Sequence, residues 1–239
     1  MKRMGYKKNL KTSVIREELM NRRDVQFKRI EYLKTKRRLE KEFPGILFVY
    51  IDETFIHKNL FYEKILYPKT KNIKLKIPIG KGTRFSVIYA GSEEGFVDNS
   101  LLILNNKEIN SEIFEDWLAN QLIPNLPTRS VIVLDNSPTH SKQQNKPPTI
   151  KDNRTSIKNW LTKNNIEYNN SETKQQLLIR VKNNTHYKTY SVDDIIKKTG
   201  HIPLRLPPYH CQLNVIELIW AQMKDMIKKK NLYKIYNNS

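Results

Sequence analysis

The chain of 239 residues is 38% hydrophobic and 10% aromatic, a composition typical of a globular domain with a buried core and not of a disordered chain. Its 43 Lys and Arg residues against 24 Asp and Glu residues give a net charge of +19, which favours a polyanionic partner, nucleic acid before an acidic membrane. The single cysteine excludes an internal disulfide framework, and the absence of an apolar run of about 20 residues argues against a membrane span.

The first 42 residues form a strongly basic segment, with 15 Lys and Arg residues against 6 Asp and Glu residues. From Ser13 to Glu42 apolar residues recur every three to four positions, which predicts a helix that ends at Pro44 and Gly45. Its basic residues form either a DNA-contacting surface or an ordinary solvated helix face. We therefore interpret residues 1–44 as a basic helical arm. The N-terminus lacks the apolar stretch of a signal peptide, so we expect an intracellular protein.

Residues 45–239 have the pattern of an α/β domain. Four short apolar runs predict strands: "ILFVYID", "RFSVIYAG", "SLLILNN" and "SVIVLDNS". Between the third and fourth runs, "NSEIFEDWLANQLIPNL" has its apolar residues on one helical face and Asn110 or Ser111 as an N-cap. Three consecutive strands, a helix and a further strand indicate a mixed sheet with helices packed on it.

A second basic segment interrupts this pattern. Residues 142–200 contain 12 Lys and Arg residues against 5 Asp and Glu residues, with many Asn residues. A structureless loop of this length is improbable in a compact domain, so we expect a helical insertion. Its three predicted helices span Ser156 to Lys163, Glu172 to Lys182 and Ser191 to Thr199. The core resumes with "IPLRL" and closes with a helix that begins near Asn214.

Three acids stand at the ends of these elements. Asp52 and Asp135 each end a strongly apolar run, and Glu217 opens the last helix. Strand ends on one edge of a sheet meet in space, and carboxylates that meet repel one another unless a cation lies between them. Hard oxygen ligands suit Mg²⁺ or Mn²⁺, and two such ions about 3.5–4 Å apart form a centre that cleaves phosphodiester bonds. The pattern therefore predicts a two-metal nuclease site in a basic protein.

Each acid also has an ordinary structural interpretation. Asp52 and Asp135 occur where Asp is common, in turns that follow strands. Glu53 is an alternative ligand, although strand alternation points it to the face opposite Asp52. Asn214 and Glu217 have the spacing of a helix-capping pair, which would make Glu217 a structural residue.

Several polar residues lie close to these acids in the sequence. Asn136, His140 and Asn214 are candidates for supporting the metal ligands or for contacting DNA, and His140 is equally compatible with a turn. His210 and Cys211 are adjacent, but one cysteine and scattered histidines do not favour a zinc site. The glycines of "GKGTR" lack the strand–loop–helix context of a phosphate-binding loop, and we expect no small-molecule cofactor.

Four motifs in a fixed order make the chain recognisable. "YIDETFIHKN", "PIGKGTRFSVIYAGSEEGFV", "VIVLDNSPTHS" and "LRLPPYHCQLNVIELIWAQMK" resemble the catalytic core of the mariner-superfamily DDE transposases. The sequence is most similar to the DDE-endonuclease-like proteins of invertebrates. The resemblance extends from about Gly5 to Lys224.

This resemblance implies a ribonuclease-H-like fold and a magnesium-dependent cut-and-paste mechanism. The three acids of the family correspond to Asp52, Asp135 and Glu217, each as a metal ligand, and a helical segment between the second and third acids is typical of this subgroup. It also implies DNA as the partner, both transposon ends and target, with a homodimer on DNA and a location in the nucleus. An RNA-cleaving ribonuclease-H-like enzyme would share these acids.

The sequence departs from the family at several points. The usual Asn-Pro-Ile-Glu of the third acid is "NVIE", with Val215 in place of proline, and the usual "DNAPYHS" is "DNSPTHS", with Thr139 in place of an aromatic residue. The paired helix-turn-helix region of the family does not precede the arm, and relatives continue beyond Ser239. We therefore expect a copy truncated at both ends. The alternative to an active transposase domain is a catalytically inactive remnant that still binds DNA.

Overall fold

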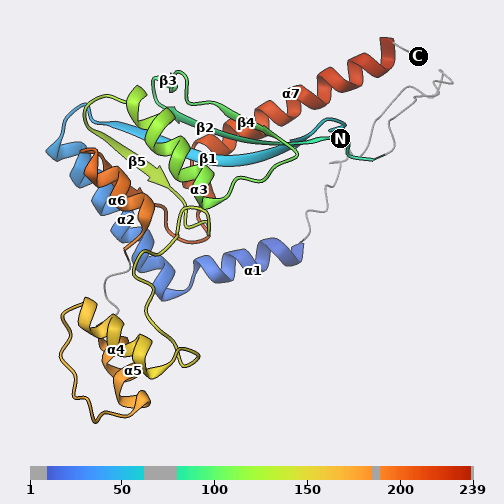
Figure 1. Cartoon of the computed structure of the whole chain (residues 1–239). Coiled ribbons are helices and arrows are strands. Elements are labelled where there is room, and N and C mark those ends of the chain that lie inside the picture. The colour runs from blue at the N-terminus through green and yellow to red at the C-terminus, as the bar shows by residue number, and fades with distance from the viewer. Residues whose placement is uncertain (1–9, 62–79, 185–188, 238–239) are drawn as a thin grey trace. The chain divides into compact units, whose positions relative to one another are not determined.

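The computed structural model describes residues 10–61, 80–184 and 189–237, and Figure 1 shows its elements. The chain divides into two compact units. One comprises Met1–His140 with Ile195–Ser239, and the other is Ser141–Asp194. In the described ranges, no helix is long and apolar enough to cross a membrane.

A mixed six-stranded sheet forms the centre of the larger unit. Its strand order is β3-β2-β1-β5-β6, and β4 pairs with β2. The strands β1, β2, β3 and β4 are joined by antiparallel pairings, whereas β5 and β6 add to β1 in parallel. The strands span Leu47–His57 (β1), Arg84–Ser92 (β2), Gly95–Phe96 (β3), Leu102–Asn105 (β4), Ser130–Leu134 (β5) and Ile202–Arg205 (β6). The predicted mixed sheet is confirmed.

The unequal lengths of β1 and β5 create an open strand edge. Every residue of β5 is buried, and its pairing with β1 covers only Leu47 to Tyr50. β1 continues for a further seven residues, to His57, paired with β2 alone on its other side. Asp52 therefore lies just beyond the point where β5 ends, and Asp135 is the first residue after β5. Strand length alone brings these two acids to the same edge of the sheet.

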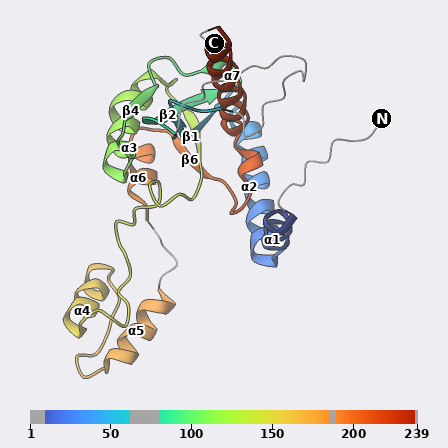
Figure 2. The ribbon, with the colours of Figure 1, turned by 90° about the vertical axis from the view of Figure 1, so that its right-hand side faces the viewer.

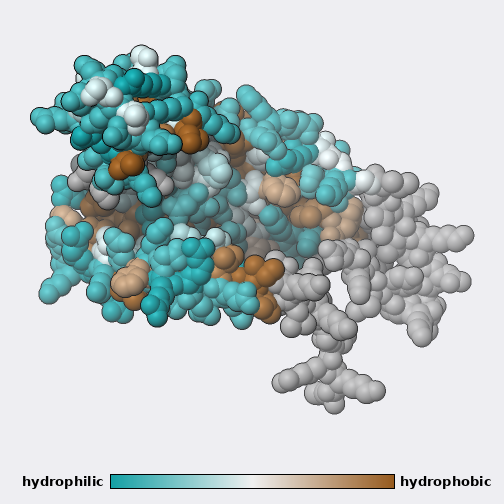
Figure 3. All heavy atoms as spheres, turned by 90° about the horizontal axis from the view of Figure 1, so that it is seen from below, coloured by the Kyte–Doolittle hydropathy of each residue, from teal (hydrophilic) through white to brown (hydrophobic). Residues whose placement is uncertain are grey.

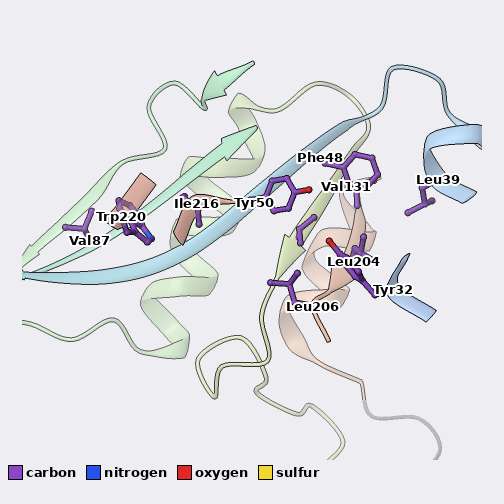
Figure 4. Close-up of a cluster of buried hydrophobic side chains, with 11 residues drawn as sticks. Tyr32, Leu39, Phe48, Tyr50, Val87, Val131, Leu204, Leu206, Ile216 and Trp220 are labelled. Carbon is purple, nitrogen blue, oxygen red and sulfur yellow. The ribbon is translucent and has the colours of Figure 1, made fainter. Parts of the chain in front are cut away.

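Helices cover the two faces of the sheet (Figure 2). α3 (Ser111–Trp117) lies on one face, and α2 (Arg23–Glu42) and α7 (Ile216–Asn237) lie on the other. One cluster of buried side chains joins α2 and α7 to the sheet, as Figure 4 shows. Its members are Tyr32, Leu39, Phe48, Tyr50, Val87, Val131, Val133, Leu204, Leu206, Ile216 and Trp220. This packing orients the first turn of α7 toward β1.

The predicted helix of the arm is in fact two helices. α1 (Leu10–Met20) ends where the amide of Asn21 donates to the Glu17 carbonyl, and Arg22 is extended before α2 begins. The residues that α2 buries, Val25, Tyr32 and Leu39, are seven residues apart, so one stripe of this helix faces the sheet. The break lets α2 follow the sheet while α1 takes a different course.

The predicted helix after β4 is confirmed and begins at the expected cap. The Asn110 side chain accepts a hydrogen bond from the Ile113 amide at 2.9 Å. Beyond α3 the chain continues through a π turn (Leu118–Leu122) and a 3₁₀ turn (Ile123–Asn125). Trp117 is buried and donates from Nε1 to the Ser100 carbonyl at 2.7 Å, which fixes α3 to the loop before β4.

The smaller unit has a core of its own. α4 (Arg154–Lys163) and α5 (Lys174–Asn183) bury a shared apolar cluster of Ile157, Leu161, Leu177 and Val181. Thr173 and Gln176 form a reciprocal capping box at the start of α5. α6 (Ser191–Lys198) follows, so helices are present at all three predicted positions. The assignment of this segment as an insertion, and of residues 1–44 as a separate arm, stays a prediction.

Most of the surface that Figure 3 shows is hydrophilic, with scattered apolar side chains. The chain is 28% charged, and its net charge of +19 must be carried largely on this surface. Basic residues are therefore available over several elements rather than in a single helix.

We expect Ile132→Ala to lower the free energy of unfolding by about 2–5 kcal/mol, because it opens a cavity in a fully buried strand. Ile132 is 0% exposed in β5, between β1 and β6. The matched control is Ile103→Ala in β4, where the side chain is 54% exposed, with an expected loss below about 1 kcal/mol. Urea unfolding measures both, and equal losses would contradict the assignment of β5 to the core.

Candidate active site

Asp52 is the buried acid of the site. Asp52 is 8% exposed on β1, and Glu217 is an exposed residue in the first turn of α7. Burial and, after it, the negative charges of Glu217, Glu53 and Asp135 together raise the pKa of Asp52 to about 7. The three predicted acids therefore lie close enough to interact, and the strongest effect of their repulsion falls on Asp52.

Asp135 is held by a different set of contacts. Its Oδ1 accepts a hydrogen bond from the Ser137 amide at 2.9 Å and lies 2.8 Å from Nδ1 of His140. Burial alone would raise the pKa of Asp135, but the hydrogen bond and charge of His140 and the nearby Arg205 lower it. Asp135 is thus an ionised carboxylate with one oxygen committed to the protein.

His140 links Asp135 to a second carboxylate. Its Nε2 lies 2.9 Å from Oε1 of Glu53, and its ring packs on Phe114 at 4.1 Å between centroids. The His140 side chain is 0% exposed, so it supports the acids from behind and does not reach solvent. Burial alone would lower the pKa of His140, but the hydrogen bonds to Asp135 and Glu53 and their charges raise it to about 9.

Glu53 belongs to this network, which the sequence did not indicate. Strand alternation points Glu53 away from Asp52, where its Oε1 contacts His140, and its side chain is still 19% exposed and lines the cleft. The sequence holds one clue to this contact. His140, five residues after Asp135, is a second polar side chain for which the sequence indicates no partner. Its location could not be predicted because it depends on the turn after β5.

That turn is fixed by hydrogen bonds to the segment after β6. The Asn136 side chain donates from Nδ2 to the Leu206 carbonyl at 2.7 Å. Arg205 donates to the carbonyl oxygens of Asp135 at 3.4 Å and His140 at 2.8 Å. Asn136 therefore holds the end of β5 in place beside Asp135. Its predicted role in supporting the metal ligands or contacting DNA stays a prediction.

Asn214 lies directly before the helix that carries Glu217. It is 2% exposed, and its Nδ2 donates to the Ile51 carbonyl at 3.4 Å, one residue before Asp52. Among the described residues its Oδ1 has no hydrogen-bond partner, and it is the backbone carbonyl of Asn214 that accepts from the Glu217 amide, at 3.2 Å. Asn214 thus connects the start of α7 to β1 and does not form the capping pair considered from the spacing.

The turn between β6 and α7 is held by the arm. Arg16 donates to the Tyr209 carbonyl at 3.2 Å and to the Gln212 side chain at 2.8 Å, with Sγ of Cys211 at 3.0 Å. Tyr209 has φ +64, which is unfavourable for a residue with a side chain. These contacts with Arg16 hold the backbone of the turn. The turn leads directly into α7, so it also helps to position Glu217.

The acids fit a hard divalent cation by their chemistry. Asp52, Asp135 and Glu217 supply only carboxylate oxygens, which Mg²⁺ and Mn²⁺ prefer, and their mutual repulsion on Asp52 is the effect that a cation relieves. In the part of the chain that the structure describes, no three Asp, Glu, His or Cys side chains are already arranged around one metal position. The assignment of the three acids as ligands stays a prediction.

A cleft of about 330 Å³ runs beside these acids along the open edge of β1. Its lining includes both Asp52 and Asp135 and, further along β1, Thr54 and Phe55. Because β5 ends before Asp52, the edge of β1 is unpaired here, and the cleft beside Asp52 and Asp135 provides room for a substrate.

The comparisons with known proteins identify this arrangement. The family model described as DDE superfamily endonuclease matches residues 47–237, which is most of the chain. The chain belongs to this family.

Three solved assemblies of Mos1 transposase share the fold of the DDE domain. They are the paired-end complex with the left transposon end (14% identity, 87% of this chain, 49% of that chain, TM-score 0.53), the mariner paired-end complex with Mn (14%, 87%, 50%, 0.52) and a pre-cleavage transpososome (12%, 86%, 49%, 0.52). At such low identity the likeness is one of fold. The family model confirms the predicted DDE family, and these structures confirm the predicted ribonuclease-H-like sheet as a fold.

The DDE domain spans about half the length of the Mos1 chains it matches, 49% and 50% in the two paired-end complexes. No curated protein sequence matches the chain.

We expect Asp52→Asn to stabilise the metal-free domain at pH 8 by up to about 4 kcal/mol, since one pKa unit corresponds to about 1.4 kcal/mol. The folded pKa of about 7 lies above the ordinary 3.8, so folding is penalised as pH rises from 4 to 7, and the penalty stays above 7. The gain should vanish near pH 4.

Urea unfolding in EDTA at pH 4 and pH 8 measures this difference. Asp98→Asn is the matched control, because Asp98 is an exposed turn residue. A gain from Asp52→Asn that is the same at both pH values would contradict the buried, repelled state of this carboxyl.

Proposed function

We propose that this chain is the catalytic domain of a DNA transposase that cleaves DNA and transfers the new strand end to a target. The observation that supports the proposal is that the charges of Asp135 and Glu217 both raise the pKa of Asp52, which lines an open cleft together with Asp135 in a domain of the DDE endonuclease family. In the first step water breaks a phosphodiester bond and leaves a free 3′-hydroxyl. In the second step that 3′-hydroxyl attacks a phosphodiester bond of the target, which forms the new bond, breaks the target bond and releases the target strand's own 3′-hydroxyl.

The three acids would hold two Mg²⁺ ions, with Mn²⁺ as a substitute. Asp52 would hold the ions together with Asp135 and Glu217, since it is the most enclosed of the three and a cation would relieve the repulsion from its neighbours. Bound divalent ions activate the attacking oxygen and neutralise the leaving oxygen in such centres. Manganese is present in one Mos1 complex of the same fold, which supports this choice.

The protein's own residues would position these ligands. His140 holds Oδ1 of Asp135, which leaves Oδ2 for a metal, and Asn214 ties the start of α7 to the backbone beside Asp52. Arg205 and Asn136 keep the turn after β5 in place. These contacts hold Asp135 and the backbone at the start of α7, which carries Glu217. They would therefore keep the carboxylates in the positions that a two-metal reaction requires.

The partner we propose is DNA, both transposon ends and target. The net charge of +19 attracts the phosphate backbone, and Lys and Arg residues of the arm and of residues 142–200 would supply salt-dependent contacts. Mos1 transposase forms paired-end complexes with transposon DNA, and we propose a corresponding homodimer of the full protein. A nuclear location follows from this substrate.

We expect the domain to nick supercoiled plasmid DNA only when Mg²⁺ or Mn²⁺ is present. Asp135→Asn should reduce the nicking rate at least about 100-fold, since a metal ligand contributes several kcal/mol to the transition state. Gel electrophoresis of the plasmid measures both rates, and Asp98→Asn is the control with the same chemical change on an exposed turn.

The outcome separates the proposed enzyme from an inactive remnant. A remnant would bind DNA in gel-shift assays, while wild type and Asp135→Asn would nick equally little. Preference for an RNA–DNA hybrid over DNA would indicate a ribonuclease instead.

Two substitutions of His140 should have different effects on metal binding. His140→Asn keeps a donor near the position of Nδ1 and thus the bond to Asp135, whereas His140→Gln places its donor nearer the position of Nε2, toward Glu53. We expect His140→Gln to weaken Mn²⁺ binding roughly 10–100-fold, and His140→Asn to weaken it less.

Mn²⁺ electron paramagnetic resonance measures the affinity directly. Thermal unfolding in EDTA provides the control for general loss of structure. Equal affinity in both variants, at equal stability, would exclude the role of Nδ1 in orienting Asp135.

A further inference from the structure

An aromatic ring stands half-exposed in the cleft beside the acids. Phe55 lies three residues after Asp52 on β1, is 50% exposed, and lines the same cleft as Asp52 and Asp135. Exposed apolar rings are common singly, so its exposure alone carries no meaning. Its position does, because the ring lines the same cleft as two of the acids, beside the part of β1 that β5 leaves unpaired.

Two cations from different elements flank this ring. The Arg84 guanidinium of β2 lies 4.7 Å from the ring centroid, and Nζ of Lys224 on α7 lies 5.5 Å from it. Both distances are within cation–π range, and half of the residue's surface still remains open. A half-open ring with two adjoining positive charges is the combination that single-strand-binding proteins use for a base and its phosphates.

We propose that Phe55, Arg84 and Lys224 form a nucleotide-binding site that stacks an unpaired DNA base next to the scissile phosphate. This inference rests on the proposed function, since it assumes that DNA occupies the cleft. The base lies against the open part of the Phe55 ring, and the two cations contact the phosphates on either side of it. The ligand is therefore an unstacked nucleotide of the cleaved or target strand.

The distance along β1 fits this assignment. Three residues of a strand span about 10 Å, which equals about three base steps of B-form DNA and fewer steps of a stretched single strand. The stacked base thus lies one to three nucleotides from the bond at Asp52. A base still paired in a duplex would have both faces covered by its neighbours, so the site selects an unstacked base.

The groups now contacting Arg84 and Lys224 do not prevent this. Glu108 pairs with Arg84 at 2.7 Å, but the Glu108 side chain is 78% exposed, and exposed ion pairs contribute only about 0–1 kcal/mol. A phosphate can replace this carboxylate. The Lys224 ammonium sits on a flexible four-carbon chain, so it can turn from the ring to a phosphate without movement of α7.

Fluorescence anisotropy in EDTA tests the site without requiring cleavage. The probes are a fluorescein-labelled 15-nucleotide oligothymidylate and a 15-base-pair duplex. We expect Phe55→Ala to weaken oligothymidylate binding roughly tenfold and duplex binding less than about twofold, because stacking on one base is lost. Phe55→Trp should retain the affinity, and Phe27→Ala, which removes a 73% exposed ring from α2, should leave it unchanged.

A base-free oligomer of 15 abasic sugar-phosphates identifies stacking as the cause. It carries the same backbone charge as the oligothymidylate, so wild type should bind it more weakly and Phe55→Ala should cause no further loss. An equal loss for both probes, equal binding of oligothymidylate by wild type and Phe55→Ala, or an equal loss from Phe27→Ala would overturn the proposal.

The two levels of inference fail separately in these assays. If wild type does not nick plasmid DNA but Phe55→Ala still loses oligothymidylate binding, the nucleotide site stands and the transposase function falls. If wild type nicks with metal and Phe55→Ala matches it in oligothymidylate affinity, the function stands and the nucleotide site falls.

Discussion

The arrangement of the candidate site depends on one constraint: the buried carboxyl of Asp52 is repelled by the carboxylates around it. Asp52 lies beyond the last β5 pairing of β1, within the electrostatic reach of Glu217, Glu53 and Asp135. Folding without a cation must therefore either protonate Asp52 or bear the repulsion. An arrangement that is costly for stability but suited to a divalent cation is characteristic of a functional site.

The rest of the larger unit keeps this arrangement from relaxing. The cluster that contains Ile216 and Trp220 anchors α7 on the sheet, so Glu217 cannot move away without disrupting the core. On the opposite face, His140 is enclosed against Phe114 and holds Asp135 and Glu53. The acids thus lie on both faces of β1, where its edge is unpaired. The cleft beside them is lined by Asp52, Glu53 and Asp135.

Local pattern was sufficient for much of the fold. The β-branched run of β5, the Asn110 cap of α3 and the apolar face of α7 were all predictable, because burial and capping leave period and residue type in the sequence. The division of the arm into two helices was not predictable, because no glycine or proline marks the break near Asn21. The contact between Glu53 and His140 was not predicted, since the two residues are 87 positions apart in the sequence.

The sequence by itself determined the element types and the order of the four motifs and named three candidate acids, because these depend on residue chemistry and short-range spacing. Only the tertiary structure decided what surrounds them: that β5 stops short and opens the edge of β1, that Asn214 binds the Ile51 carbonyl, and that His140 is buried. Strand register and long-range contacts are set by packing across the sheet, and no local pattern encodes which distant residue fills a given space.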